Sequence, residues 1–296
     1  MVLLPPPEDR CSPKMVKLIA GSKIARGAIL CVLDDDTMLP TEGWETCLPL
    51  LETPDVGLAF GLPYYVHFGN FWSALVACFV NSHSLLTYIP YTFLIDPFTI
   101  NGMFYVMRRD VFDRVGGFTG LETALMDDFA VAQRFRQAGY KLAQSPVRHG
   151  ISTHVEDGHR YTCLLQRWFI FPRETVMKAL PPRELAIAYG LGLVSILFPL
   201  FWLILFLVHP RAWEGIVGLV YLLTNYGIFA HFNVHYLYRA TPWRVSWLIP
   251  VIQLLLPIQL LVALLSPQRI VWRGHVMQIE PGGTFRFVRR RPANKD

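Results

Sequence analysis

Residues 28–36 read AILCVLDDD, and our prediction of the fold starts from these nine residues. Ala28 to Leu33 is an apolar run of strand length, and Lys17 to Arg26 before it has the spacing of a helix. Asp34, Asp35 and Asp36 follow the strand directly. Ligands of α/β sheets bind beyond the carboxyl ends of strands, so these aspartates are the first candidates for a site.

Further strands and a second helix are predicted along the first half of the chain. Runs of strand length span Val56 to Leu62 and Gly102 to Met107. Asp127 to Gly139 has the pattern of an amphipathic helix that a glycine closes. The alternation of strands and helices indicates an α/β domain over residues 1–180.

Two groups of acidic residues carry the candidate chemistry. Carboxylates concentrated at a strand end hold a hard divalent cation, which neutralises a diphosphate. A solvated acidic turn is the alternative for Asp34 to Asp36. Asp127 and Asp128 open the second predicted helix, where the helix dipole favours carboxylates. A capping role explains one of these two aspartates but not both.

A third candidate group is the tripeptide Gln166, Arg167 and Trp168. It combines a guanidinium with a large aromatic surface, which suits a phosphate leaving group and stacking against a sugar or lipid. An anchoring pair at a membrane interface, just before the first long apolar run, is the alternative.

The second half of the chain indicates a membrane protein. Of the 296 residues, 53% are hydrophobic and 17% are charged, against about a quarter charged in soluble domains. Three uncharged runs, at 185–208, 216–238 and 245–265, contain the ~20 residues that cross a bilayer as a helix. We therefore expect transmembrane helices over residues 185–265.

A fourth apolar stretch lies within the first half. Residues 71–95 contain no Asp, Glu, Lys or Arg, but polar residues interrupt the stretch and Pro90 breaks it. We predict a helix that lies in the membrane interface in preference to a fourth span. A buried helix of the soluble part is the alternative.

The basic charge of the chain is concentrated at its end. The net charge is +5. Residues 267–296 form a basic tail with these Lys and Arg side chains: Arg269, Arg273, Arg286, Arg289, Arg290, Arg291 and Lys295. A nucleic-acid-binding protein spreads its basic residues over a binding face, so no nucleic-acid partner is predicted. A basic segment after an apolar run is instead typical of the cytoplasmic side of a bilayer.

This tail conflicts with three membrane crossings. If the first half is cytoplasmic, an odd number of crossings places the basic tail on the far side of the membrane, against the positive-inside tendency. Either one run does not cross, or the tail departs from that tendency. Pro250 and Pro257 make the third run the first candidate for an interrupted span.

Several motifs follow one another in a specific order: SPKMVKLIAG, CVLDDD, GLPYYV, NGMFYVMRRDVFDRVGGF, MDDFAVAQRFRQAGYKL, QRW, the apolar runs and SPQRIVWRG. In this order they resemble the ceramide glucosyltransferases and their hopanoid-pathway relatives, which are inverting glycosyltransferases of the family 2 and family 21 type. The resemblance covers nearly the whole chain. It implies a GT-A-like, Rossmann-related domain that binds a nucleotide sugar at the cytoplasmic face of the membrane, followed by transmembrane helices.

The resemblance also implies a reaction and its donor site. A hexose, glucose in the first instance, passes from a UDP-sugar to a lipid hydroxyl, with ceramide as the expected acceptor. Asp34 and Asp36 match aspartates that hold a divalent metal, Mg²⁺ or Mn²⁺, and the UDP diphosphate. Lys14 matches a lysine that lies near the nucleotide.

The acceptor side of the reaction is assigned in the same way. Asp127 and Asp128 match an acidic pair, of which the second residue is the general base that deprotonates the acceptor hydroxyl. An inverting displacement needs such a base on the acceptor side and a cation on the leaving diphosphate. Arg167 and Trp168, with Gln166 beside them, match a signature near the leaving group and acceptor.

Two departures from the family pattern bear on these assignments. Leu164 stands where the signature has Gln or Arg. Family members also carry an N-terminal membrane anchor and earlier strands of the nucleotide fold, so we expect a domain that is incomplete at its N-terminus. The alternative activities are a hopanoid-type lipid glycosyltransferase with an N-acetylhexosamine donor and, in another class, an inactive membrane scaffold.

Overall fold

The strand predicted ahead of the aspartates lies at one side of a five-stranded sheet in the computed structural model, which describes residues 4, 7–272, 274–280 and 282–290. The strand order is β1-β4-β3-β5-β2. The bounds are Ile29–Leu33 (β1), Thr37–Met38 (β2), Val56–Tyr65 (β3), Phe104–Arg108 (β4) and Lys141–Ile151 (β5). Three of these strands, β1, β3 and β4, confirm the strands predicted from the sequence.

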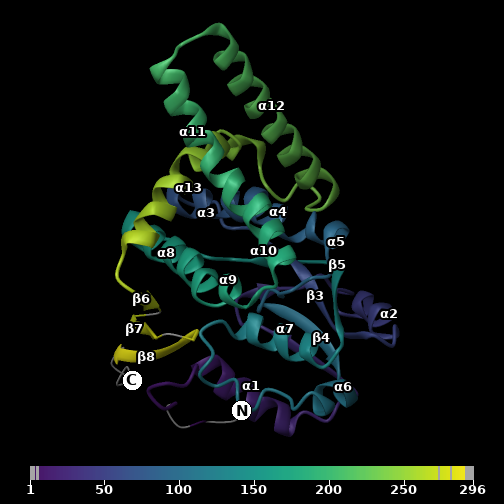
Figure 1. Cartoon of the computed structure of the whole chain (residues 1–296). Helices are drawn as coiled ribbons and strands as arrows, with labels where there is room; N and C mark the ends of the chain where they lie inside the picture. Colours follow the sequence, from purple (N-terminus) through teal and green to yellow (C-terminus); the bar gives the residue numbers. More distant parts are fainter. Residues whose placement is uncertain (1–3, 5–6, 273, 281, 291–296) are drawn as a thin grey trace.

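The sheet is mixed, because it contains both antiparallel and parallel strand pairs. β4 runs antiparallel to β1 and to β3, β3 and β5 are parallel, and β2 is antiparallel to β5. Strands β1, β3 and β5 therefore point the same way. Their carboxyl ends meet at one end of the sheet, where Asp34 follows β1 (Figure 1).

The sequence pattern does not predict β5. Residues 141–151 read KLAQSPVRHGI, in which polar residues and a proline hide any strand period. The segment is a strand because β3 pairs with it, with a register shift between the partners of Phe60 and Leu62. Pro146 falls inside this shift, where a missing N–H does not break the ladder.

Helices cover both faces of the sheet. On one face lie α1 (Pro13–Ile24), α6 (Arg109–Arg114) and α7 (Asp127–Gln137). Their residues Met15, Phe112 and Phe135 pack with Phe60 and Tyr105 of the strands in one buried cluster. On the other face lie η1 (Glu45–Cys47) and α2 (Leu48–Leu51).

The two predicted helices are confirmed with small changes in their bounds. α1 begins earlier than predicted because the Ser12 side chain caps it and Pro13 occupies its first turn. α7 ends at Gln137, and Gly139 just beyond it has φ 85°, a conformation that favours glycine.

The apolar stretch 71–95 forms a chain of short helices. These are α3 (Phe71–Phe79), the π-helix η2 (Val80–Ser84), α4 (Leu85–Tyr88) and α5 (Tyr91–Leu94). Residues 73–78 of α3 are buried, and α3 contacts both α8 and α13. This burial corresponds to the alternative of a buried helix for α3. The interfacial position of the whole stretch remains a prediction.

The second half of the chain is helical. Its elements are α8 (Gly158–Glu174), α9 (Val176–Ala179), α10 (Pro182–Ala188), η3 (Tyr189–Val194), α11 (Ser195–Val208), α12 (Ala212–His235), η4 (Trp243–Val245) and α13 (Leu248–Leu265). Three helices, Pro182–Val208, Ala212–His235 and Leu248–Leu265, are long and apolar enough to cross a membrane. They coincide with the three predicted apolar runs. α11 and α12 rise as a hairpin above the α/β domain (Figure 1).

The segment interpreted as a basic tail requires a correction, because most of it is a folded sheet. Strands β6 (Arg269–Trp272), β7 (His275–Glu280) and β8 (Thr284–Arg289) pair antiparallel. Ile279, Phe285 and Phe287 are buried with Leu125 and Ile170 of the α/β part. The apolar residues alternate with the basic ones, so the sheet buries one face and exposes the other. Arg273, Arg291 and Lys295 lie outside the described residues.

Candidate active site

Four of the residues singled out in the sequence meet at the end of β1. The Lys14 ammonium lies 2.9 Å from Oδ1 of Asp34 and 3.3 Å from Oδ2 of Asp127. It also donates to the Gly102 carbonyl oxygen at 2.7 Å. Asp128 adjoins this group, and its carboxylate is one of the charges that act on Lys14. The Lys14 ammonium therefore contacts two carboxylates, and the charge of a third acts on it. Asp34 is far along the chain from the Asp127–Asp128 pair.

Each member of this cluster is placed by local structure. Lys14 sits in the first turn of α1, and the backbone N–H of Ser12 donates to the Glu122 carbonyl at 2.7 Å, which fixes the entry to that helix. The N–H of Asp34 donates to the Met103 carbonyl at 2.9 Å, so the turn after β1 is tied to the segment before β4. Asp127 stands at the N-terminus of α7, where the dipole favours its charge.

Asp128 has the properties of a general base. Burial, together with the charge of Asp127, raises the pKa of the Asp128 carboxyl to about 7. The backbone N–H of Phe129 donates to its Oδ1 at 2.7 Å, which opposes this rise and orients the carboxyl group. A carboxylate with a pKa near 7 accepts a proton more readily than an ordinary aspartate, and about half of it is ionised at neutral pH.

Lys14 and Asp34 hold opposite charges in a partly desolvated place. Burial acts to lower the pKa of Lys14, but the carboxylates of Asp127 and Asp34 outweigh it, and the pKa is raised. Burial raises the pKa of Asp34, against the effect of Lys14. Lys14 therefore stays charged and is the cation that keeps this acidic cluster together.

Asp36 occupies a different position from Asp34. It is exposed in the turn after β1, yet its charge acts on both Asp34 and Tyr65. Among the described residues there is no group of three or more His, Cys, Asp or Glu side chains arranged to hold a metal ion. Mg²⁺ binds through one or two carboxylates together with substrate phosphates. The carboxylates of Asp34 and Asp36 are of the type that such a cation binds, and that of Asp34 is paired with Lys14 in this structure.

Arg167 and Trp168 lie on α8, and both act on Tyr65, which is the last residue of β3. The Trp168 ring stands edge-on to Tyr65, with centroids 6.3 Å apart, and stacks on Phe79 at 5.7 Å. The charge of Arg167 acts on the Tyr65 hydroxyl, and its guanidinium lies 6.0 Å from the Trp272 ring of β6. Gln166 is half-buried on the same helix. The Lys14 cluster therefore lies at the carboxyl end of β1, and the group of Tyr65, Arg167 and Trp168 lies at the carboxyl end of β3.

Three residues of this site were not singled out in the sequence. A Cβ on Gly102 would come within 3.3 Å of Lys14 Nζ and of Asp128 Cβ, so glycine leaves the room that the cluster needs. Tyr105 of β4 is fully buried, and Asp127, Asp34 and Asp128 all raise the pKa of its phenol, in addition to burial. The charges of Asp36 and Arg167 both act on the Tyr65 phenol. Gly102 lies just before β4, whereas Tyr65 and Tyr105 stand in apolar-looking strands, where the only sequence signal is the adjacent aromatic residues in GLPYYV and NGMFYV.

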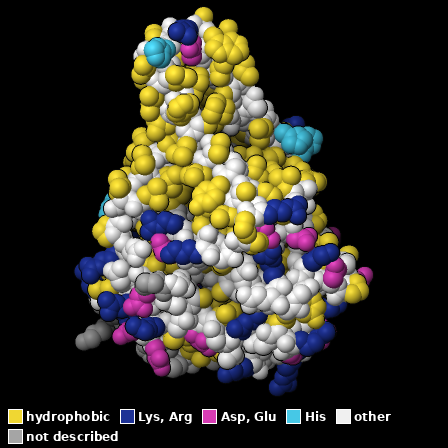
Figure 2. Space-filling model, viewed as in Figure 1, with side chains coloured by type: hydrophobic (Ala, Val, Ile, Leu, Met, Phe, Trp, Pro, Cys, Tyr) yellow, Lys and Arg dark blue, Asp and Glu magenta, His cyan; other side chains and the backbone are white. Residues whose placement is uncertain are grey.

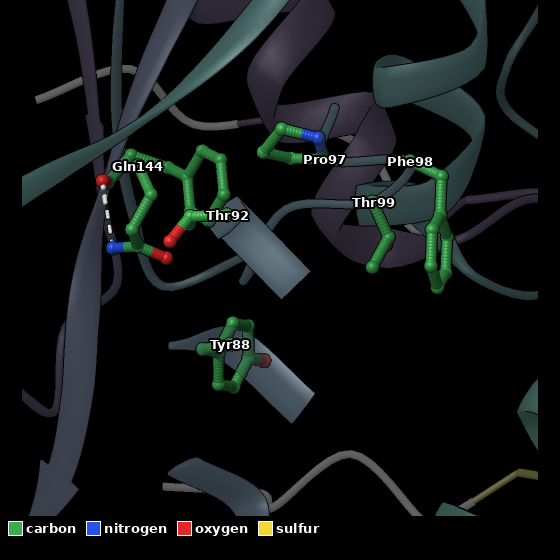
Figure 3. A pocket seen from close by; sticks show the side chains of 7 residues that line it. Tyr88, Thr92, Pro97, Phe98, Thr99 and Gln144 are labelled. Atoms are coloured by element: carbon green, nitrogen blue, oxygen red, sulfur yellow. Dashed lines mark hydrogen bonds between the residues drawn. The ribbon is translucent and has the colours of Figure 1, made fainter. Parts of the chain in front are cut away.

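A small pocket is lined by residues of which none was predicted as a site residue: Phe60, Tyr88, Thr92, Pro97, Phe98, Thr99 and Gln144 (Figure 3). Tyr88 of α4 faces it, and Asp128 contributes to the raised pKa of this buried phenol, after burial itself. Gln144 of β5 donates to the Phe60 carbonyl at 3.3 Å. The side-chain oxygen of Gln144 is buried without a hydrogen-bond partner in the described part of the chain.

Comparison with known proteins identifies the class of protein. The sequence profile of the family described as Glycosyl transferase family 21 matches residues 2–285. The chain therefore belongs to glycosyl transferase family 21. The match, together with the mixed sheet, supports the predicted GT-A-like fold.

One solved structure with similarity to this chain is the crystal structure of GalNAc-T7 with UDP, GalNAc and Mn2+. The sequences are 13% identical over 60% of this chain and 40% of that chain, with a TM-score of 0.37. This chain thus spans about two-fifths of that protein. The likeness is too distant to support an argument about the site.

Proposed function

We propose that this protein transfers glucose from UDP-glucose to a hydroxyl group of ceramide, with inversion at the anomeric carbon. The observation that supports this best is the cluster at the end of β1, where Lys14 contacts Asp34 and Asp127 beside Asp128. It combines a proton acceptor with residues suited to an anionic leaving group, as a single displacement requires.

In the proposed reaction Asp128 is the catalytic base. Its carboxylate removes the proton of the acceptor hydroxyl while the hydroxyl oxygen attacks the anomeric carbon of the donor. The bond from that carbon to the diphosphate oxygen breaks, and its electron pair leaves with UDP. Asp128 then holds the proton, which it releases to solvent after the glycolipid departs.

The other residues act on the donor. Lys14 and Arg167 supply positive charge for the diphosphate, and Trp168 supplies a flat surface for a sugar or lipid. Gln166 and Asp127 complete the proposed binding set. Asp34 and Asp36 would hold Mg²⁺ or Mn²⁺. When bound, such a cation stabilises the negative charge on the departing diphosphate.

The catalytic side is proposed to face the cytoplasm. The described basic residues of β6 to β8, namely Arg269, Arg286 and Arg289, belong to the same body as the cluster. Lys and Arg near membrane spans favour the cytoplasmic side. A cytoplasmic site has direct access to UDP-sugars.

The test is transfer of labelled glucose from UDP-glucose to ceramide by membranes that contain the full chain, with and without Mg²⁺ or Mn²⁺. Asp128→Asn is expected to lower transfer by about 10² or more. Asp113→Asn, at an exposed position of α6, is the matched control and is expected to leave it unchanged. Transfer only from an N-acetylhexosamine donor to a hopanoid-type lipid would replace this assignment by that alternative. Equal phenotypes of the natural chain and Asp128→Asn in cells would favour an inactive scaffold.

A further inference from the structure

The α11–α12 hairpin presents apolar side chains outward along its whole length. Only 6% of the first candidate span and 17% of the second are buried, and side chains such as Leu207 and Leu223 are 69% and 62% exposed. Figure 2 shows this apolar surface rising above a charged body. α12 has 24 residues, which at 1.5 Å per residue is about 36 Å, enough to cross the ~30 Å hydrocarbon core.

The tip of the hairpin is polar. The turn between α11 and α12 contains His209 and Arg211, and Glu214 follows in the first turn of α12. Basic, acidic and histidine side chains gather at this tip in Figure 2. Trp213 is exposed beside them. Charges next to an exposed tryptophan are typical of a membrane–water interface, so the tip belongs in water beyond the apolar band.

The other end of the hairpin is fastened to the α/β domain. Asn81 exchanges hydrogen bonds with the backbone of Tyr65 at 2.7 and 2.9 Å, and donates to Thr241 Oγ1 at 2.9 Å. Asn233 of α12 in turn exchanges two 2.9 Å hydrogen bonds with the Thr241 backbone. Arg148 of β5 donates to the Leu237 carbonyl at 2.7 Å. α12 therefore ends on the side of the catalytic cluster.

The start of the hairpin lies on that same side. Arg136 of α7 and Glu184 of α10 form an ion pair at 2.5 Å, which ties the helix leading into α11 to the domain. The chain thus leaves the domain through α11 and returns to it through α12.

α13 differs from the hairpin helices, because 44% of its candidate span is buried. One side, with Ile252 and Leu256, packs in the cluster that holds α3 and α8, and Gln259 accepts from the Tyr161 hydroxyl of α8 at 3.5 Å. The opposite side exposes Ile258 and Leu265. α13 thus packs one side on the α/β part and leaves the opposite apolar side free to contact lipid.

The chain beyond α13 returns to the same domain. The N–H of Leu125 donates to the Gly283 carbonyl, and that of Phe287 to the Asp9 carbonyl, both at 2.9 Å. Leu125 lies just before Asp127, and Asp9 lies just before Lys14. The sheet of β6 to β8 and the catalytic cluster are therefore on one side of the membrane, which requires an even number of crossings.

We propose that α11 and α12 cross the membrane as a two-helix hairpin, and that α13 lies in the interface of the near leaflet with its Ile258 side against lipid. The conflict between a basic C-terminal segment and three crossings then disappears, because this segment stays on the side of Asp128. The membrane partner of α13 is the lipid surface.

The test measures from which side of the membrane a single cysteine reacts with an impermeant maleimide. It uses sealed right-side-out and inside-out membrane vesicles that contain the protein. In the full chain the partly or fully exposed Cys11, Cys31 and Cys163 are replaced by serine, and Arg211→Cys, Arg286→Cys or Lys17→Cys is added. Lys17→Cys and Arg286→Cys are expected to react from one side and Arg211→Cys from the other. Reaction of Arg286→Cys from the Arg211 side would establish three crossings and overturn the proposal, as would reaction of all three from one side.

Two further measurements keep the proposal testable. A protease-cleavable tag after Asp296 in the chain with its natural cysteines is expected to be cut only from the side of Lys17, and cleavage from the other side would overturn the proposal. Nitroxide labels at Ile258→Cys and Leu223→Cys report depth in the bilayer. The label at 258 is expected to be shallow and that at 223 deep, and equal depths would contradict an interfacial α13.

Discussion

The Nζ atom of Lys14 lies 3.3 Å from Oδ2 of Asp127, although α1 and α7 are far apart in the sequence. Because Asp34 shares the same ammonium, Lys14 joins the strand that carries the metal-binding candidates to the helix that carries the candidate base. The donor and acceptor halves of the proposed reaction are thus held together by one side chain.

Replacement of this lysine should therefore affect both halves. Lys14→Met removes the only ammonium in contact with Asp34 and Asp127 among the described residues. The remaining carboxylates repel one another, so the pKa of Asp128 should rise further and kcat/KM at neutral pH should fall by about 10². Lys17→Met, at an exposed position of α1, is the control. An unchanged pH profile in Lys14→Met would contradict the coupling of Lys14 to Asp128.

The pH dependence of transfer should follow Asp128. Because its pKa is raised to about 7, the carboxyl holds a proton at lower pH and cannot act as a base. kcat/KM should rise about tenfold per pH unit below this value and level off above it. Steady-state kinetics between about pH 5 and pH 8 would measure the profile. A profile that is flat over this range would exclude Asp128 as the base.

Asp128 should also make the fold less stable at higher pH. Its pKa is 3.8 in an ordinary environment and about 7 in the folded protein. Between these values the folded protein holds a proton that the unfolded chain has released, so the free energy of unfolding falls as pH rises through this window. Asp128→Asn keeps an acceptor for the Phe129 N–H and removes the buried charge. We expect its Tm in detergent to exceed that of the natural protein above pH 7, while the two converge near pH 4.

Gly102 should be intolerant of even one methyl group. In Gly102→Ala the new Cβ lies 3.3 Å from Lys14 Nζ and from Asp128 Cβ, which must give way by a few tenths of an ångström. Transfer should fall by at least about tenfold, because misplacement by a fraction of an ångström is costly at a reacting centre. Gly21→Ala is the matched control, since nothing lies within 4 Å of its Cβ and alanine favours the helix. Comparable losses in both variants would indicate a general effect of the substitution.

The C-terminal sheet should contribute to stability. Phe285 is 2% exposed and packs with Ile170 and Leu125, so Phe285→Ala should cost about 3–5 kcal/mol of unfolding free energy. Val288→Ala, on the exposed side of β8, should change it little. Denaturant unfolding in detergent measures both. Equal stability of the two variants would contradict a folded C-terminal sheet and would favour an unstructured basic tail.

Much of the site could be predicted because its acidic residues lie in short, recognisable sequence motifs. Asp34 follows an apolar run, and Asp127 and Asp128 begin an amphipathic helix, so each motif could be placed at an element end. The pattern gave no sign that Gly102 would separate Lys14 from Asp128. A glycine can precede a strand for many structural reasons. Only the nearness of the Lys14 and Asp128 side chains shows why glycine is needed at position 102.

The amino-acid sequence alone was enough to predict the strand ahead of Asp34, the helix that begins with Asp127 and Asp128, and three apolar helices. Local hydrophobic periodicity and composition are enough for these, because they depend on neighbours along the chain. Long-range packing is what brings Lys14 to Asp127, places Trp168 against Tyr65 and folds β6 to β8 against the α/β domain. These outcomes depend on strand register and on burial between distant segments. No local pattern contains that information.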